Sequence, residues 1–318
     1  MPAPAPHEEP AAGAARGPLA VRLCNWVGEV VLSLPTLRRL AAAGYSLELI
    51  GRRWAVELLA GSGFPVSVRP AATLDAIRQF RALRRARGAS APPALLLTKS
   101  FSSALEARLG GWRPIGYARD ARSWLLARAV PLPRFAHASH AYWHLASAFL
   151  GADAPYPTEV GLQPSAGQLA RADALLAERG LGGGFIVLCP FSGADDRERA
   201  KVWPGFAELG RRLATAGTAT VVCPGPGEES RVQQVLPAAV SLAGLDLGGY
   251  AAVLARARAV VANDTGPGHL AAAVGARLVA VYGPRSVAAW APLGARVTLL
   301  HEHAGWSGVE AVEAALAG

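Results

Sequence analysis

Residues 259–274 read Ala-Val-Val-Ala-Asn-Asp-Thr-Gly-Pro-Gly-His-Leu-Ala-Ala-Ala-Val. The first four residues predict an apolar strand and the last five predict a helix. Asp264 or Thr265 can cap that helix, and Gly266 lets a ligand approach the backbone closely. A helix N-terminus offers free N–H groups and partial positive charge, so the motif predicts a phosphate site that His269 can also reach. The alternative is an ordinary capped helix with a surface histidine.

Short apolar runs alternate with helical patterns along the whole chain. The expected strands are 19–24, 46–50, 66–68, 94–98, 114–117, 185–189, 218–223, 240–242, 259–262 and 278–282. The expected helices are 30–42, 53–60, 74–87, 101–109, 165–178 and 206–216. The pattern restarts after a Gly/Pro-rich segment at 151–164, which predicts an α/β protein of two Rossmann-like domains facing across a cleft. We expect the domains at 19–158 and 159–318.

The chain has 318 residues, of which 52% are hydrophobic, enough for two packed domains. It has no apolar stretch of about 18 residues that would indicate a membrane span. Residues 1–18 are rich in Ala and Pro and lack the pattern of a signal peptide, so we expect a disordered extension and a cytoplasmic protein. Cys24, Cys189 and Cys223 lie in or at the end of apolar runs and predict buried, reduced thiols.

The net charge of +9 comes entirely from the first half of the sequence. Residues 1–160 contain nineteen Lys/Arg and ten Asp/Glu, whereas residues 161–318 contain thirteen of each. An excess of this kind attracts an anionic partner such as a phosphate-bearing lipid, a nucleic acid or an acidic membrane surface. The alternative is the arginine bias of a GC-rich genome.

Four segments together resemble glycosyltransferase family 9, the ADP-heptose:lipopolysaccharide heptosyltransferases. The first is the motif at 259–274 together with Val-Ala-Val-Tyr-Gly-Pro at 279–284. The others are Asn-Trp-Val-Gly-Glu-Val-Val-Leu-Ser-Leu-Pro-Thr-Leu at 25–37, Pro-Phe-Ser-Gly at 190–193 with Lys-Val-Trp-Pro at 201–204, and Pro-Gly-Pro-Gly-Glu-Glu at 224–229. The resemblance covers about residues 19–295, and it implies a GT-B fold and an inverting, metal-independent transfer.

In the family, the position of Glu29 usually holds an aspartate, the proposed general base that takes the proton from the acceptor hydroxyl. A carboxylate suits this role because desolvation raises its pKa. The extra methylene of Glu29 moves the carboxylate, and misplacement of about 1 Å can cost about a hundredfold in rate. Either the acceptor sits differently here or the base is weakened. The alternative for Glu29 alone is an acid favoured by the helix dipole.

The resemblance also assigns the donor side. Lys201 would neutralise the diphosphate and stabilise its charge as it leaves, and it is one of only two lysines in the chain. Ser192 and Thr265 could donate hydroxyls to phosphate oxygens. Glu228 or Glu229 could accept from the ribose hydroxyls, a choice that the sequence leaves open. The full set of candidate donor-binding residues is Ser192, Lys201, Glu228, Glu229, Asp264, Thr265, Gly266 and His269. Trp203 could wall the nucleotide site or belong to the core.

The basic first half would bind the acceptor, because the lipopolysaccharide core carries carboxylates and phosphates. The preferred acceptor residues are Lys99, Arg119 and Arg122, with further candidates at Arg52, Arg53 and the 81–87 arginine cluster. The cluster can equally be a solvated helix face. His137, His140 and His144 form one helical stripe, but no carboxylate accompanies them and we expect no metal site.

The resulting prediction is a transferase that moves a heptose, or a related sugar, from ADP-heptose to the lipopolysaccharide inner core. The nucleotide sugar is a co-substrate, and no cofactor is expected. We expect a monomer in the cytoplasm, with peripheral contact at the inner membrane and no nucleic-acid partner. One alternative is a catalytically impaired family member that acts as a nucleotide- or glycolipid-binding module. The other is a nucleic-acid-binding α/β protein, which only the basic half supports.

Overall fold

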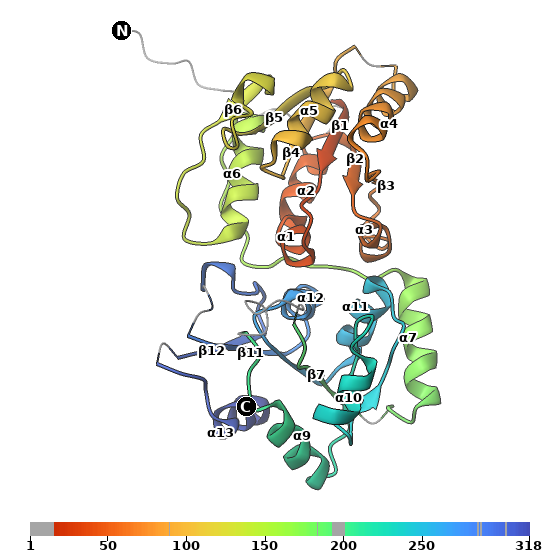
Figure 1. Cartoon of the computed structure of the whole chain (residues 1–318), viewed down its shortest axis with the longest axis vertical. Coiled ribbons are helices and arrows are strands. Elements are labelled where there is room, and N and C mark those ends of the chain that lie inside the picture. The colour runs from red at the N-terminus through yellow and green to blue at the C-terminus, as the bar shows by residue number, and fades with distance from the viewer. Residues whose placement is uncertain are drawn as a thin grey trace.

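The computed structural model describes residues 16–88, 90–182, 184–192, 201–284, 286, 288–302 and 304–318. Its strands form two parallel sheets that lie in two lobes, with the first half of the chain in one lobe and the second half in the other (Figure 1). Helices pack against both sheets, as the strand–helix alternation predicts. No helix in the described ranges is long and apolar enough to cross a lipid bilayer.

The first sheet has the order β3-β2-β1-β4-β5-β6, and all its strand pairs are parallel. Its strands are β1 (Gly17–Arg22), β2 (Tyr45–Gly51), β3 (Val66–Val68), β4 (Pro93–Leu96), β5 (Arg113–Tyr117) and β6 (Arg128–Val130). Gly17 pairs with Tyr45. The extension predicted for residues 1–18 is therefore too long by at least two residues, and its first fifteen lie outside the described residues.

The second sheet has the order β12-β11-β10-β7-β8-β9, which repeats the order of the first when strands are counted from β7. Its strands are β7 (Ile186–Cys189), β8 (Thr220–Val222), β9 (Val240–Ser241), β10 (Ala259–Ala262), β11 (Leu278–Tyr282) and β12 (Val297–His301). Sequence reasoning missed β6 and β12, the last strand of each sheet. Both are edge strands with little buried surface, so neither shows the apolar run on which strand prediction depends.

The helices of the first lobe are α1 (Val27–Leu32), α2 (Leu34–Ala42), α3 (Trp54–Leu58), α4 (Thr73–Ala86), α5 (Phe101–Leu109) and α6 (Ala138–Leu150), with a 3-10 turn at Ser123–Leu125. The single helix expected at 30–42 is thus divided in two. Pro35 lacks the N–H that would bond to the carbonyl of Val31, and the Ser33 hydroxyl instead donates to the Val30 carbonyl at 2.8 Å.

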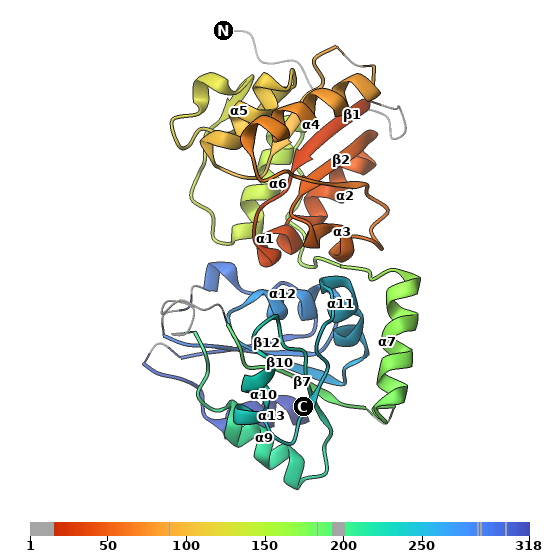
Figure 2. The same cartoon turned by 45° about the vertical axis from the view of Figure 1, so that its right-hand side comes forward.

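The second lobe contains α7 (Ala166–Glu178), α9 (Phe206–Thr215), α10 (Glu229–Val235), α11 (Leu247–Arg256), α12 (Gly266–Ala273) and α13 (Val309–Ala317), with a 3-10 turn at Ala288–Trp290. The chain passes from α6 of the first lobe to α7 of the second through residues 151–165 (Figure 2). Sequence reasoning left open whether residues 308–317 return to the first lobe. They do not, because α13 packs on β11 and α9 of the second.

The two lobes touch mainly through two helix pairs, α1 with α12 and α3 with α11 (Figure 1), and α6 also contacts the 3-10 turn at Ala288–Trp290. At the start of α7, Ser165 and Gln168 form a capping box, in which each side chain accepts from the other's backbone N–H. The same Gln168 side chain donates to the carbonyl of Glu57 at 2.7 Å, in the first lobe. The lobes are therefore in direct polar contact beside the connecting segment.

Candidate active site

The motif at residues 259–274 lies where expected, with its loop between β10 and α12. Asn263 is fully buried, and its side chain accepts from the Trp203 N–H at 2.9 Å and donates to the carbonyls of Cys189 and Pro190 at 3.3 and 3.2 Å. It thereby ties the end of β7 to the end of β10 and to the segment that carries Lys201. The loops that hold the donor-side candidates are thus fixed to one another at the carboxyl ends of central strands.

The N-terminus of α12 is available to a ligand. Thr265 occupies the cap position, but its side chain makes no capping bond with any described residue. Its hydroxyl instead lies 3.5 Å from the carbonyl of Asn263. The expected side-chain cap is therefore wrong, and the first turn of α12 offers a ligand mainly the N–H of Gly266, because Pro267 has no N–H and the Gly268 N–H donates to the Thr265 carbonyl at 3.1 Å. Gly266 faces Val27 of the first lobe, with an added Cβ at 3.5 Å.

Lys201 and Asp264 come together at this point. The Lys201 Nζ lies 4.0 Å from the Asp264 carboxylate, and both side chains are mostly buried. Asp264 also interacts with the hydroxyl of Tyr282 from β11. A carboxylate next to a phosphate would repel it, so the geometry fits Asp264 better as the residue that orients Lys201 than as a direct phosphate ligand.

His269 does not supply the positive charge that its position in the motif indicates. Burial lowers the pKa of its imidazole to about 4, and the charges of His137 and Lys201 act in the same direction. The ring is therefore neutral near pH 7. It packs against Gly28 of α1, where an added Cβ would lie 2.6 Å from the ring carbon Cδ2. This contact joins the donor motif to the first lobe.

The two candidate ribose acids are placed differently. The Glu228 carboxylate accepts from the N–H of Gly225 at 2.9 Å and is half-buried. Burial raises the pKa of Tyr250, and the charge of Glu228 makes a smaller contribution in the same direction. The Glu229 carboxylate accepts from the N–H of Gly227 at 2.8 Å and is exposed. Both acids shape the loop, and only Glu228 also faces the interior of the lobe.

The remaining donor-side candidates lie near the end of β7. Ser192 follows Cys189 and is half-buried, whereas Gly193 lies outside the described residues. Trp203 is fully buried, and its indole N–H donates to the carbonyl of Ser307 at 2.9 Å. Trp203 is therefore a core residue and does not wall a nucleotide site.

Glu29 lies in the first turn of α1, directly after Gly28. Its carboxylate accepts a hydrogen bond from the Tyr142 hydroxyl of α6 at 3.2 Å. Burial raises the pKa of the Glu29 carboxyl, while the Tyr142 hydrogen bond and the charge of Lys99 lower it. The Tyr142 hydroxyl also interacts with the buried thiol of Cys24. Glu29 is thus a partly desolvated acid whose carboxylate is held by the Tyr142 hydroxyl.

The acceptor-side candidates separate into three groups. Lys99 is half-buried and lies near Glu29. Arg119 is exposed and lines an open hollow of about 520 Å³ with Asp120. Arg122 is fully buried, so its assignment to acceptor binding is wrong. Its guanidinium donates to the carbonyls of Tyr117 and Ser100 at 3.1 Å and stabilises the loops after β4 and β5.

The other basic and histidine candidates have neighbours of their own. Arg87 pairs with Glu48, and Arg81 donates to a backbone carbonyl, so these members of the cluster bind the protein itself. The rings of His137, His140 and His144 have three different partners, namely the carbonyl of Ala291, the ring of Tyr156 and the hydroxyl of Tyr117.

Sequence reasoning missed three site residues. Asn263 is the first, and its signal in the sequence is an amide directly after an apolar strand, which indicates a structural link. Arg22 ends the buried strand β1, and a charge inside an apolar run is itself a signal. Tyr142 offers no such signal, because its importance depends on how α6 packs against α1.

A sequence profile of glycosyltransferase family 9 (heptosyltransferase) matches residues 79–311, well over half of the chain. The chain belongs to glycosyltransferase family 9. The lipooligosaccharide heptosyltransferase 2 of Haemophilus influenzae is 36% identical over 138 residues, which cover 40% of this chain and 38% of that relative. The family match begins after Gly28 and Glu29, so the roles of these two residues rest on the geometry.

Solved structures of the family share the fold. The ADP-heptose LPS heptosyltransferase II of E. coli superposes with a TM-score of 0.77 at 23% identity, covering 94% of this chain and 98% of that one. A family 9 glycosyl transferase from Veillonella parvula gives 0.78 at 19% identity, covering 91% and 86%. The E. coli heptosyltransferase WaaC with ADP gives 0.71 at 22% identity, covering 93% and 98%. The predicted GT-B fold is therefore confirmed.

Proposed function

We propose that this chain moves a heptose, or a related sugar, from ADP-heptose to the lipopolysaccharide inner core, with inversion and without a bound metal. One observation supports this most directly. Gly28 touches His269 at the interface between the lobes, so the backbone of Glu29, the next residue, lies close to α12 and its donor motif. In this proposal a base from one lobe acts beside an anion site from the other, as a displacement reaction requires.

The chemistry follows from these positions. Glu29 takes the proton of an acceptor hydroxyl while that oxygen attacks the anomeric carbon from the face opposite the diphosphate. The bond from the anomeric carbon to the diphosphate oxygen breaks, and ADP leaves with the electron pair. Lys201 and the Gly266 N–H at the start of α12 stabilise the negative charge that develops on the leaving group. These groups do the work for which a metal ion is otherwise used, and no cofactor takes part.

The environment of Glu29 fits a base. Partial burial makes the carboxylate more basic, while Tyr142 and Lys99 keep it ionised. The Tyr142 hydrogen bond also restricts a side chain that is one methylene longer than the family's aspartate. This arrangement favours an active transferase over a nucleotide-binding module, although turnover itself decides between the two.

The test is release of ADP when the purified protein is incubated with ADP-heptose and a heptose-free core acceptor. We expect turnover in the presence of a chelator, and a loss of at least about a hundredfold for Glu29→Gln with ADP binding retained. Glu178→Gln, an exposed acid at the end of α7, serves as the matched control. ADP binding without transfer from any donor, or full turnover by Glu29→Gln, would contradict the proposal.

We place the protein in the cytoplasm, in peripheral contact with the inner membrane. This location is supported by the basic first half and by Trp124, which is 73% exposed with its ring 6.0 Å from Phe101. Sedimentation with phosphatidylglycerol vesicles should fall for Trp124→Ala. It should be unchanged for Trp290→Ala, an exposed tryptophan of the second lobe. Equal sedimentation of both variants would remove this part of the proposal.

A further inference from the structure

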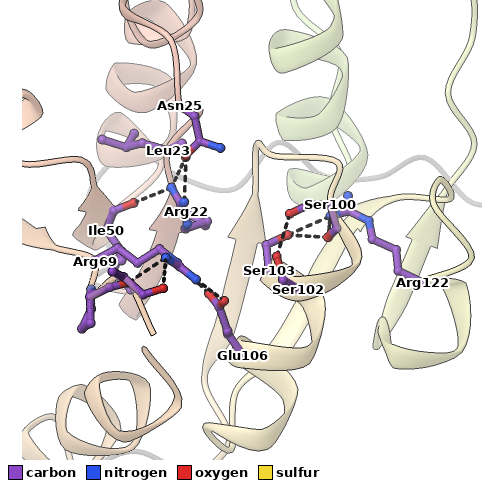
Figure 3. Close-up of polar contacts among 12 residues, drawn as sticks. Arg22, Leu23, Asn25, Ile50, Arg69, Ser100, Ser102, Ser103, Glu106 and Arg122 are labelled. Atoms are coloured by element: carbon purple, nitrogen blue, oxygen red, sulfur yellow. Dashed lines mark hydrogen bonds and ion pairs between the residues drawn. The ribbon is translucent and has the colours of Figure 1, made fainter. Parts of the chain in front are cut away.

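A second polar pocket lies in the first lobe, beside Glu29 and away from the donor motif. Its volume is about 440 Å³, and it opens at the carboxyl ends of β1, β2 and β4. Its lining includes Arg22, Arg52, Arg69, Ser100, Ser102 and Glu106. Arg22 and Arg69 lie on one side of the pocket, and Ser100, Ser102 and Ser103 lie on the other (Figure 3).

Arg22 is a buried guanidinium without a carboxylate. It is only 5% exposed, and its partners are neutral: the carbonyls of Leu23 and Ile50 and the side-chain oxygen of Asn25, the last at 2.9 Å. Its Nε has no hydrogen-bond partner, and no described acid lies within ion-pair distance. Burial, followed by the charge of Arg69, lowers the pKa of Arg22 to about 10. Such a charge is costly unless an anion joins it.

The one acid in the pocket is already engaged. Glu106 is fully buried, and it binds Arg69 with both carboxylate oxygens, at 3.0 Å from Nε and 2.5 Å from Nη2 (Figure 3). This pair is close to electrically neutral. The exposed Arg52 also lines the pocket and has no ion pair within the described ranges. Arg22 and Arg52 therefore leave the pocket with an excess of positive charge.

The opposite wall supplies hydrogen-bond donors. Ser100 holds the cap position of the nine-residue helix α5, and its side chain makes no capping bond with a described residue. The Ser102 hydroxyl lies 3.3 Å from that of Ser100 and is exposed. The free N–H groups at the start of α5 and these hydroxyls suit an oxyanion, which the guanidinium of Arg22 would meet from the other side.

We infer that this pocket binds one anionic group of the acceptor, a carboxylate or a phosphate monoester, and thereby sets which acceptor hydroxyl meets Glu29. The inference rests on the proposed function. Two short connections place the pocket next to the base: Asn25 lies one turn before Glu29, and Ser100 follows Lys99, whose charge acts on Glu29. In this scheme Arg22 binds the anionic group of the acceptor. The negative charge of that group offsets the cost of burying the Arg22 guanidinium.

Binding is tested without turnover, by calorimetric titration of the purified protein with inorganic phosphate and, separately, with glucuronate. The tighter of the two identifies the kind of anion. Arg52→Ala should weaken that binding about tenfold. Arg128→Ala, an exposed arginine of β6 that does not line the pocket, should leave it unchanged. Binding of neither anion, or equal weakening by both variants, would overturn the inference.

Arg22→Met provides a second test. Its unfolding midpoint is measured with and without the anion that binds. The wild-type midpoint should rise with ligand, whereas the variant's midpoint should not. A variant stabilised by the anion as much as the wild type would show that Arg22 serves the fold alone.

Kinetics separate this inference from the proposed function. Arg52→Ala should raise the acceptor KM about tenfold and leave the donor KM unchanged. An unchanged acceptor KM in an active enzyme would refute the pocket's role while the proposed function stands. Anion binding that Arg52→Ala abolishes, in a protein that transfers no sugar, would refute the proposed function while the pocket stands.

Discussion

Replacing Gly28 with alanine should damage catalysis without damaging the fold. Gly28 lies in α1 and has an ordinary helical backbone, so alanine fits its conformation and is about 1 kcal/mol more favourable there. The three atoms nearest to an added Cβ all belong to the ring of His269 in the opposite lobe. An added Cβ would lie 2.6 Å from Cδ2, 3.0 Å from Nε2 and 3.3 Å from Cγ.

The size of the effect follows from these distances. Non-bonded carbons rest about 3.5–4.0 Å apart, so the ring and α1 must separate by about 1 Å. Glu29 is the next residue along α1 and moves with it, away from the donor motif. A displacement of about 1 Å between reacting groups can cost about a hundredfold in rate. We therefore expect kcat to fall by about that factor, with ADP affinity changed far less.

The assay is ADP release at saturating substrates, together with thermal unfolding. Gly167→Ala, in the first turn of α7, is the control, because its Cβ would only approach Arg171 at 3.6 Å. A double-mutant cycle adds a sharper criterion. Gly28→Ala should have little further effect once His269→Ala has removed the ring. Undiminished kcat for Gly28→Ala, or additive effects in the cycle, would refute this account of the contact.

Three further outcomes are expected. Tyr142→Phe removes a hydrogen bond that lowers the pKa of Glu29, so the acid limb of the kcat/KM profile should move to higher pH; an unmoved limb would separate Glu29 from the titration. Asn263→Ala should lower the free energy of unfolding by about 3 kcal/mol and weaken ADP binding, because three buried hydrogen bonds are lost; ADP binding at the wild-type level would count against its linking role. Trp112→Phe loses a buried bond to the carbonyl of Phe80, so chemical denaturation should show a loss of about 1–3 kcal/mol while kcat per folded molecule stays constant.

The fold was predictable because most of its strands are buried on both faces. The apolar runs of β10 and β11 each predict a buried strand. Because such runs alternate with helices, they predict two parallel sheets. The strands β6 and β12 were missed because each lies at a sheet edge with little buried surface. Their presence depends on a free edge of the neighbouring strand, which local composition does not encode.

The site was predictable where function depends on a local motif. The motif placed Thr265 at the start of a helix directly after β10, and Lys201 lies 4.0 Å from Asp264 of the same motif; the donor-binding roles of both residues stay predictions. Contacts made across the chain were not predictable. Arg122 looked like a surface ligand because arginine is ordinarily exposed, yet it is buried against backbone carbonyls. The neutral state of His269 depends on burial by the opposite lobe, and Tyr142 reaches Glu29 only through helix packing.

Gln168 makes two connections with one amide group. Its oxygen completes the start of α7, while its nitrogen holds the carbonyl of Glu57 in the other lobe. The two connections are chemically separable, since glutamate would keep the acceptor and lose the donor. A single substitution can therefore remove this polar contact between the lobes and leave α7 capped. How firmly the lobes hold together at this point can thus change independently of the residues proposed to react.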